Sequence, residues 1–238
     1  MQPSPKFPTT RWTLVVSAGR EPDSRCTDAL ASLCERYWYP IYAFTRRRGY
    51  SRDEAQDLTQ EFFAQVLEKR YLERADREKG RFRTFLLSSL QYFLCDQADR
   101  RLALKRGGGR PHLPFLMESG ESVYQHEPSH EETPERVFER RWALALLDRV
   151  LARLRDDFVR EGRGKHFDRL KLFLLEAGEV PYATVALELG TSEGAIKVAV
   201  HRLRKRYREV FRAEIADTVA SPSDVEGEIR YLLAALSP

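Results

Sequence analysis

The chain has 238 residues, of which 42% are hydrophobic and 32% charged, and this length suits one or two cores of ordinary domain size. Its 40 Lys and Arg against 36 Asp and Glu leave a formal net charge of +4, so the distribution of charge is more informative than the total. No apolar run is long enough to span a bilayer and no apolar segment follows a basic N-terminus, which predicts a soluble, cytoplasmic protein without membrane partners. Apolar residues recur at spacings of three and four, which predicts an all-α fold and excludes β-sandwiches and doubly wound sheets. The three cysteines are too few for a disulfide framework.

The first predicted helical block, residues 27–106, follows an N-terminal extension at residues 1–26. Its first helix contains Pro40, which is expected to kink or divide the helix near Tyr39. Its second helix begins at Ser51, because Ser51 and Glu54 form a capping box. The outer side of this second helix is polar and becomes acidic toward its N-terminus; it includes Asp53, Asp57, Gln60 and Glu61.

The third helix of this block begins near Arg81 and combines cations with aromatic rings. Basic residues lie around both of its ends: Lys79, Arg81 and Arg83 at the start, and Arg100, Arg101, Lys105 and Arg106 at the end. Aromatic rings beside cations suit single-stranded DNA, because every base offers a face for stacking. Helical spacing nevertheless places most of these rings in a core, so Tyr92 or a ring between Tyr71 and Phe82 is the best candidate for stacking.

Residues 107–133 form a predicted flexible linker between two helical blocks. The glycines from Gly107 to Gly109 end the preceding helix, because glycine loses the most backbone entropy in a helix. Between Pro111 and Glu135 the chain has six Glu, four Pro and no Lys or Arg. This composition predicts an extended or loosely ordered acidic segment.

The second block, residues 134–218, begins with a long helix whose predicted N-cap is Thr133. Further on, two short helical patterns flank the turn at residues 190–192, and such a pair matches a helix-turn-helix. The twelve residues from Lys197 to Arg208 in the second of these helices include six Lys or Arg and no acid. Charged surface helices usually mix both signs, so this run predicts DNA contact rather than a solvated face. The candidate contacts are Lys197, His201, Arg202, Arg204, Lys205 and Arg208.

A final amphipathic helix is predicted within residues 219–238. Ser223 and Glu226 form its capping pattern, and its apolar residues at helical spacing are Val225, Ile229, Leu232, Leu233 and Leu236. A helix of this length is marginal in water by itself, so the apolar face needs a partner. Packing on the second block is the favoured expectation; an external partner or a cover over the basic helix are the alternatives.

No set of residues has the spacing of a catalytic centre, and no phosphate-binding loop follows a strand. His126 and His130 lie four apart among glutamates, but the linker offers no thiol pair and no apolar shell for a metal. We therefore expect a protein that is not an enzyme and that binds no metal or other cofactor.

Two segments resemble the extracytoplasmic-function (ECF) group of bacterial sigma-70 family RNA polymerase sigma factors. Residues 53–67, DEAQDLTQEFFAQVL, resemble the region 2 helix that grips the β′ clamp helices of the polymerase. The matching residues are Asp57, Leu58, Gln60, Glu61 and Phe63. Residues 182–207 resemble region 4, the helix-turn-helix that reads the minus-thirty-five element. The matching residues are Ser192, Glu193, Gly194, Ile196, Lys197, His201, Arg202 and Leu203.

This resemblance implies a transcription initiation factor that binds core RNA polymerase, through its β′ clamp helices and β flap, and promoter DNA. Asp53, Asp57, Gln60 and Glu61 would contact the polymerase. Ser192 and Val198 would join the DNA contacts, and residues 82–101 would melt the promoter and read the minus-ten element. The chain departs from the family pattern at residues 85–86, at residues 90–92 and at Val198-Ala199. An anti-sigma factor is a further candidate partner.

The acidic linker has two interpretations beside this resemblance. It would either mimic nucleic acid in a basic channel of the polymerase or serve only as a solvated tether.

The main alternative function is an operator-binding regulator whose first block is a sensor or dimerisation domain, and a helical hydrolase is a more distant one. The acidic face with Asp57, Gln60 and Glu61 favours the sigma factor, because a repressor does not need it.

Overall fold

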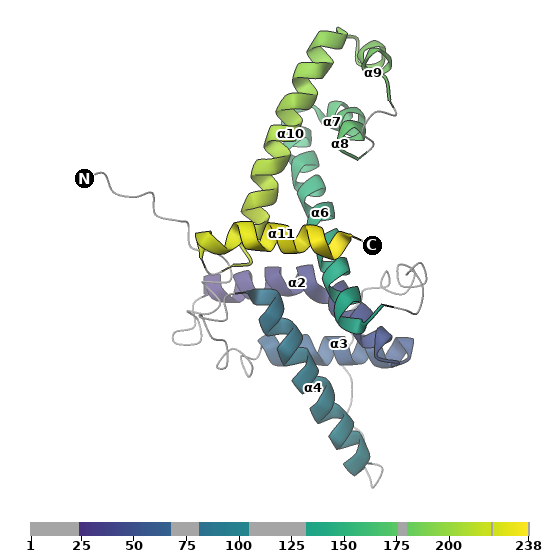
Figure 1. The fold of residues 1–238 in the computed structure, drawn as a ribbon, viewed down its shortest axis with the longest axis vertical. Helices are drawn as coiled ribbons and strands as arrows, with labels where there is room; N and C mark the ends of the chain where they lie inside the picture. Colours follow the sequence, from purple (N-terminus) through teal and green to yellow (C-terminus); the bar gives the residue numbers. More distant parts are fainter. Residues whose placement is uncertain (1–23, 68–80, 105–131, 176–179, 220, 238) are drawn as a thin grey trace, which may run out of the picture. The chain divides into compact units, whose positions relative to one another are not determined.

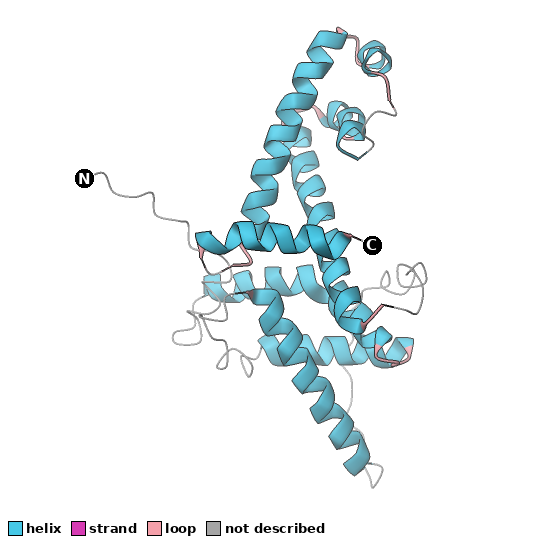
Figure 2. Ribbon diagram, viewed as in Figure 1, coloured by secondary structure: helices cyan, strands magenta, loops and turns pink. Residues whose placement is uncertain are grey.

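The computed structural model describes residues 24–67, 81–104, 132–175, 180–219 and 221–237. Within these ranges every regular element is a helix (Figure 2). The only β feature in them is an isolated bridge between Arg81 and Val219. The predicted all-α class is therefore confirmed for this part of the chain. Two compact units make up the structure: unit 1 is Met1–Leu144 with Ala216–Pro238, and unit 2 is Ala145–Ile215. None of the helices in the described ranges is long and apolar enough to cross a membrane.

Unit 1 begins with three helices whose order follows the prediction (Figure 1). They are α2 (Ser24–Arg47), α3 (Arg52–Leu67) and α4 (Phe82–Leu104). Of the two outcomes expected at Pro40, division of the helix is wrong, because α2 runs through the proline as one element, and the kink stays a prediction. The proline removes one backbone donor, but Tyr37, Ile41 and Phe44 on the same helix are fully buried, and their packing outweighs that loss.

The core of unit 1 is built from aromatic side chains of α2, α3, α4 and the start of α6 (Pro134–Arg160). The ring of Tyr37 lies 5.1 Å from that of Phe82 and 6.3 Å from that of Phe138, between ring centroids. Phe62 and Phe93 meet at 5.6 Å. The first turns of α6 therefore belong to unit 1, so unit 2 begins later than the second block of the sequence analysis.

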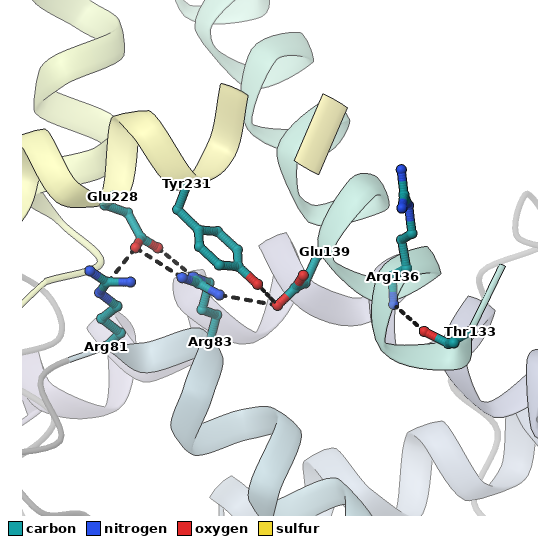
Figure 3. Close-up of polar contacts among 7 residues, drawn as sticks. All are labelled: Arg81, Arg83, Thr133, Arg136, Glu139, Glu228 and Tyr231. Carbon is teal, nitrogen blue, oxygen red and sulfur yellow. Dashed lines mark hydrogen bonds and ion pairs between the residues drawn. The ribbon is translucent and has the colours of Figure 1, made fainter. Parts of the chain in front are cut away.

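The predicted N-terminal caps of two helices, α3 and α6, are confirmed. Ser51 and Glu54 form the capping box that begins α3: the Ser51 backbone N–H donates to Glu54 Oε2 at 3.0 Å, and the Glu54 N–H donates to Ser51 Oγ at 3.4 Å. Thr133 Oγ1 accepts from the Arg136 N–H at 3.3 Å and caps α6 (Figure 3).

The C-terminal helix belongs to unit 1. It contacts the predicted second block at the start of α6, where the Tyr231 hydroxyl donates to Glu139 and Arg136 donates to the Ser237 carbonyl. It is also paired with Arg81 and Arg83 of the predicted first block. It consists of the short 3-10 helix η3 (Pro222–Asp224) followed by α11 (Val225–Leu236). The cap also differs from the prediction, because Ser221 Oγ accepts from the Ser223 N–H at 3.4 Å. Val225 and Leu232 of α11 are buried, and Glu228 between them is buried as well. The pairing of this carboxylate with α4 explains the placement.

Unit 2 contains the rest of α6, then α7 (Gly164–Leu170), α8 (Leu172–Leu175), α9 (Tyr182–Glu188) and most of α10 (Glu193–Ala216). The long helix α6 ends at Arg160, and Gly162 shortly after it has a φ of 71°, a left-handed conformation that suits glycine. The Arg163 N–H then donates to the Phe158 carbonyl at 2.7 Å. Aromatic contacts hold the short helices: Phe158 with Phe167 at 5.5 Å, and Phe173 stacked on Tyr182 at 4.6 Å.

Candidate nucleic-acid interface

A tight turn joins α9 to α10 in unit 2. Gly190 has φ 63°, and the Thr191 N–H donates to the Ala186 carbonyl at 2.9 Å, which closes the end of α9. Ser192 Oγ accepts from the Ala195 N–H at 3.2 Å and caps the start of α10. The turn predicted at residues 190–192 is therefore confirmed.

The packing of α10 separates an inner stripe from an outer face. Ile196, Val200 and Leu203 are buried at 2% exposure each. Val198, Arg202 and Lys205 lie at spacings of four and three on the opposite side, and all three are exposed. The inner stripe holds the helix on its unit and leaves the outer face open to a partner.

Three cations of the basic run are held by groups of unit 2. Lys197 Nζ lies 2.7 Å from Glu193 Oε1, and this hydrogen bond and charge raise the pKa of Lys197 above its ordinary value. Arg206 donates to Asp157 at 2.9 Å and to Glu161 at 3.0 Å. Arg204 donates to the Phe173 carbonyl at 3.0 Å and is exposed, so its expected role in DNA contact stays a prediction.

The remaining polar side chains of the run lack such partners. His201, Arg202, Lys205 and Arg208 are exposed, and none of these side chains has a hydrogen-bond or ionic partner in the described ranges. Like charges on one helix face repel each other unless a polyanion neutralises them. This outer face is the candidate nucleic-acid interface.

The predicted polymerase-binding residues lie on one side of α3. Asp53 and Glu61 are exposed, whereas Asp57 and Gln60 are partly buried. Ala55 and Phe62, on the other side of the helix, are fully buried. Glu61 Oε1 accepts from Gln97 Nε2 of α4 at 2.7 Å, so this carboxylate also links two helices of unit 1.

The part of α4 beyond Leu90 presents an aromatic ring and a cation. Tyr92 is 70% exposed, whereas Phe82 and Phe93 are buried, so Tyr92 stays a candidate for stacking and Phe82 does not. Most of the other predicted segment, between Tyr71 and Phe82, lies outside the described residues. Arg100 is exposed and pairs with Asp96 at 2.9 Å. Lys79, Lys105 and the side chain of Arg101 lie outside the described residues.

At the start of α4 the structure contradicts a predicted DNA contact. Arg83 is buried and bonded to Glu228 of α11, with Nε 2.6 Å from Oε1 and Nη2 3.2 Å from Oε2 (Figure 3). Burial by itself lowers the pKa of Arg83, but the hydrogen bond and charge of Glu228 outweigh it, so the pKa lies above its ordinary value. Arg83 stabilises the fold and is not available to phosphate.

Three partly exposed residues complete a cluster around the buried pair of Arg83 and Glu228. Arg81 Nε lies 3.2 Å from Glu228 Oε2, so this predicted DNA contact is also paired within unit 1. Glu139 of α6 accepts from Arg83 Nη1 at 3.4 Å and from the Tyr231 hydroxyl. The guanidinium of Arg83 lies 3.7 Å from the centroid of the Tyr231 ring (Figure 3). We call these five residues the Arg83 cluster.

Sequence reasoning missed the acidic half of the Arg83 cluster, although one signal was present. Glu228 lies on the apolar stripe of the C-terminal helix, three residues after Val225 and four before Leu232. A carboxylate on a stripe that must be buried requires a cation opposite, because an unpaired buried charge is costly.

The predicted acidic linker lies mostly outside the described residues, as do His126 and His130. Two of its six glutamates are described, and both are used within unit 1. Glu132 lies 3.3 Å from Arg140 and 3.5 Å from Arg136, and Glu135 accepts from Gln91 at 3.2 Å. These two carboxylates support the start of α6, so any mimicry of nucleic acid falls to the other four. Within the described ranges no three His, Cys, Asp or Glu residues cluster as metal ligands would.

Comparison of the chain with protein-family models, with characterised proteins and with solved structures finds no match.

Proposed function

We propose that the protein is a sigma-type transcription initiation factor that binds core RNA polymerase and directs it to promoters. In this proposal α9 and α10 form a helix-turn-helix, and α10 enters the major groove of DNA. The observation that carries it is the set of exposed side chains on the outer face of α10 that have no partner among the described residues: His201, Arg202, Lys205 and Arg208. The protein acts by binding, so it needs no catalytic residue or cofactor.

The distribution of ion pairs in unit 2 supports a polyanionic partner. Arg153 and Arg149 lie 2.9 and 3.4 Å from the buried Glu214, and Arg206 pairs with Asp157 and Glu161. These ion pairs join α6 and α10: Glu214 of α10 neutralises two cations of α6, and Asp157 and Glu161 neutralise Arg206 of α10. The cations on the outer face are left for charge that comes from elsewhere.

The polar face of α3 favours a polymerase partner over the operator-binding alternative. A DNA-binding regulator has no use for carboxylates on the outer side of a helix in its other unit. Asp53 and Asp57 are on this face, one helical turn apart, where a basic surface can engage both. The exposed Tyr92 and Arg100 of α4 add a second site for promoter DNA, suited to unstacked bases.

Run-off transcription with purified bacterial core polymerase and a promoter library tests the proposal. We expect discrete transcripts only when the full chain is present, and all of them should start at related promoter sequences. Sequence-specific binding to DNA without any polymerase-dependent transcript would favour the operator-binding regulator instead. No transcript and no preferred DNA sequence would refute both.

Charge reversal on α3 tests the polymerase contact separately. An Asp57→Lys/Glu61→Lys variant should lose co-purification with core polymerase, because both charges then repel a basic surface. An Asp148→Lys/Asp156→Lys variant changes the net charge by the same amount at exposed positions of α6 and should bind normally. Glu61 also bonds Gln97, so circular dichroism of both variants should confirm that the helices persist. Equal binding by the two variants would contradict the assignment.

A further inference from the structure

Unit 2 is an insertion within unit 1. The chain leaves unit 1 within α6, between Leu144 and Ala145, and returns to it within α10, between Ile215 and Ala216. Two units of one chain move relative to each other by default, unless something beyond a single connection restrains them. The attachment of the returning segment to unit 1 is therefore a second restraint on unit 2, besides the connection through α6.

The returning segment is attached to unit 1 as soon as α10 ends. Asp217 lies 3.6 Å from Arg36 of α2. The Thr218 carbonyl accepts from the Phe82 N–H at 3.2 Å, and Val219 forms the β bridge to the residue before Phe82. Thr218 and Val219 are buried. The chain is thus fixed at the start of α4 within three residues of the end of α10.

The helix that follows keeps this attachment in place. Glu228 of α11 is fully buried and pairs with Arg83 at 2.6 Å and with Arg81 at 3.2 Å (Figure 3). A Cβ atom at Gly227 would lie 3.3 Å from Arg81 Nη2, so glycine lets α11 lie close to this arginine. All of these residues belong to unit 1. We call residues 217–219 and 221–237 the C-terminal clamp.

The two candidate DNA contacts of the proposed function lie in different units. The exposed Arg202 and Lys205 of α10 belong to unit 2, whereas the exposed Tyr92 and Arg100 of α4 belong to unit 1. Two sites on one chain bind two elements of one DNA together only when the connection between the sites can span the separation of the elements. A connection of limited reach therefore favours one separation over others.

We propose that the C-terminal clamp sets the length of DNA that the protein accepts between its two promoter elements. The clamp holds the end of α10 at the start of α4, so unit 2 has two attachments to unit 1 instead of one, and fewer separations of the two DNA contacts are accessible. The clamp residues act by positioning. This inference rests on the proposed function, because it takes α4 and α10 as the helices that bind promoter DNA.

An insertion between Ala216 and Asp217 tests this inference, because it loosens the attachment and keeps every residue of the clamp. Six Gly and Ser residues add a flexible segment with an average span of about 13 Å. A spacer longer by two base pairs moves one promoter element by about 7 Å and turns it by about 70° about the DNA axis. The inserted segment is long enough to follow that displacement.

Run-off transcription with core polymerase is measured on promoters that differ only in the length of the spacer. With the unchanged protein we expect transcription to fall by about ten-fold or more when the preferred spacer is changed by two base pairs. With the six-residue insertion the same change should lower transcription by no more than about three-fold, and a three-residue insertion should give an intermediate ratio. A loss of stability alone would lower transcription at every spacer length and leave the ratio unchanged.

The acidic linker provides the matched control. The same six residues inserted after Gly108 lengthen the connection between α4 and α6, and both ends of this connection belong to unit 1. This variant should keep the spacer preference of the unchanged protein. Protection of the Phe82 amide from hydrogen exchange reports whether the clamp is docked in each variant, because that N–H donates to the Thr218 carbonyl.

The outcomes separate this inference from the proposed function. No promoter-dependent transcript with the unchanged protein refutes the proposed function and this inference with it. Promoter-dependent transcripts with the same spacer preference before and after insertion at Ala216, or with no spacer preference at all, overturn the role of the clamp and leave the proposed function standing. Equal relaxation by the insertion after Gly108 overturns it as well, because the clamp is then not what sets the spacing.

Discussion

Replacing Glu228 with alanine tests whether α11 is an integral part of unit 1. The carboxylate is fully buried and lies 2.6 and 3.2 Å from two nitrogens of Arg83 and 3.2 Å from Arg81 Nε. Its removal leaves the buried Arg83 beside Glu139, at 3.4 Å. A buried charge that loses its partner costs about 3–5 kcal/mol. Glu139 compensates in part, so we expect the free energy of unfolding to fall by about 3 kcal/mol.

Tryptophan fluorescence during urea unfolding of the full chain measures this change. The three tryptophans, Trp12, Trp38 and Trp142, all belong to unit 1, and unit 2 has none. Trp142 is also local to the perturbation, because its ring centroid lies 5.3 Å from the Arg83 guanidinium. With a urea dependence of about 1–3 kcal/mol per molar, the expected loss lowers the midpoint by about 1–3 M.

Two further variants distinguish the cost of an unpaired charge from the loss of packing. An Arg83→Met/Glu228→Leu double variant removes both charges and should recover most of the stability lost by Glu228→Ala. Asp168→Ala breaks the exposed pair with Arg155, at 3.3 Å, and should change the stability by no more than about 0.5 kcal/mol. A Glu228→Ala protein as stable as the Asp168→Ala control would refute the role assigned to the cluster.

Two predictions concern the candidate interface and the buried core. Lys205→Gln should reduce the slope of log affinity for DNA against log salt concentration by about 1, because one phosphate contact is lost. Arg206→Gln removes a cation already paired with Asp157 and should leave the slope unchanged. Equal slopes for both variants would contradict a phosphate contact at Lys205. Burial raises the pKa of Cys34 from 9.0 to about 12, and burial likewise raises the pKa of the Tyr37 hydroxyl. Both groups ionise more readily in the unfolded chain, so their contribution to stability should be constant from pH 7 to about pH 8.5 and fall as the pH rises toward 12; urea midpoints between pH 7 and 11 that do not change would refute this.

The features that could be predicted from the sequence are those decided within a few residues. The capping box of Ser51 and Glu54, the cap at Thr133 and the turn at Gly190 each depend on side chains within one helical turn, and the structure has all three. The basic run of α10 could also be identified from the sequence, because residues 197–208 contain six Lys or Arg and no acid.

Pairings across long stretches of chain could not be predicted. Arg83 and Glu228 are 145 residues apart, and nothing in the spacing of either helix indicates that they meet. Arg206 likewise finds Asp157 at a separation of 49 residues, so the sequence could not show which cations of the basic run are neutralised. Tertiary packing decides these pairings, and they determine which charged residues support the fold and which are left for a partner.

The Arg83 cluster also limits where α4 can meet DNA in the proposed function. Arg83 is buried with Glu228, and exchange of this pair for a phosphate would leave Glu228 buried without its closest cation. Arg100 pairs with Asp96 at the surface, where ion pairs contribute little and exchange for phosphate is inexpensive. Tyr92, 70% exposed, also lies beyond Leu90. DNA contact by α4 therefore belongs to the part beyond Leu90, and α11 holds the start of the helix in place.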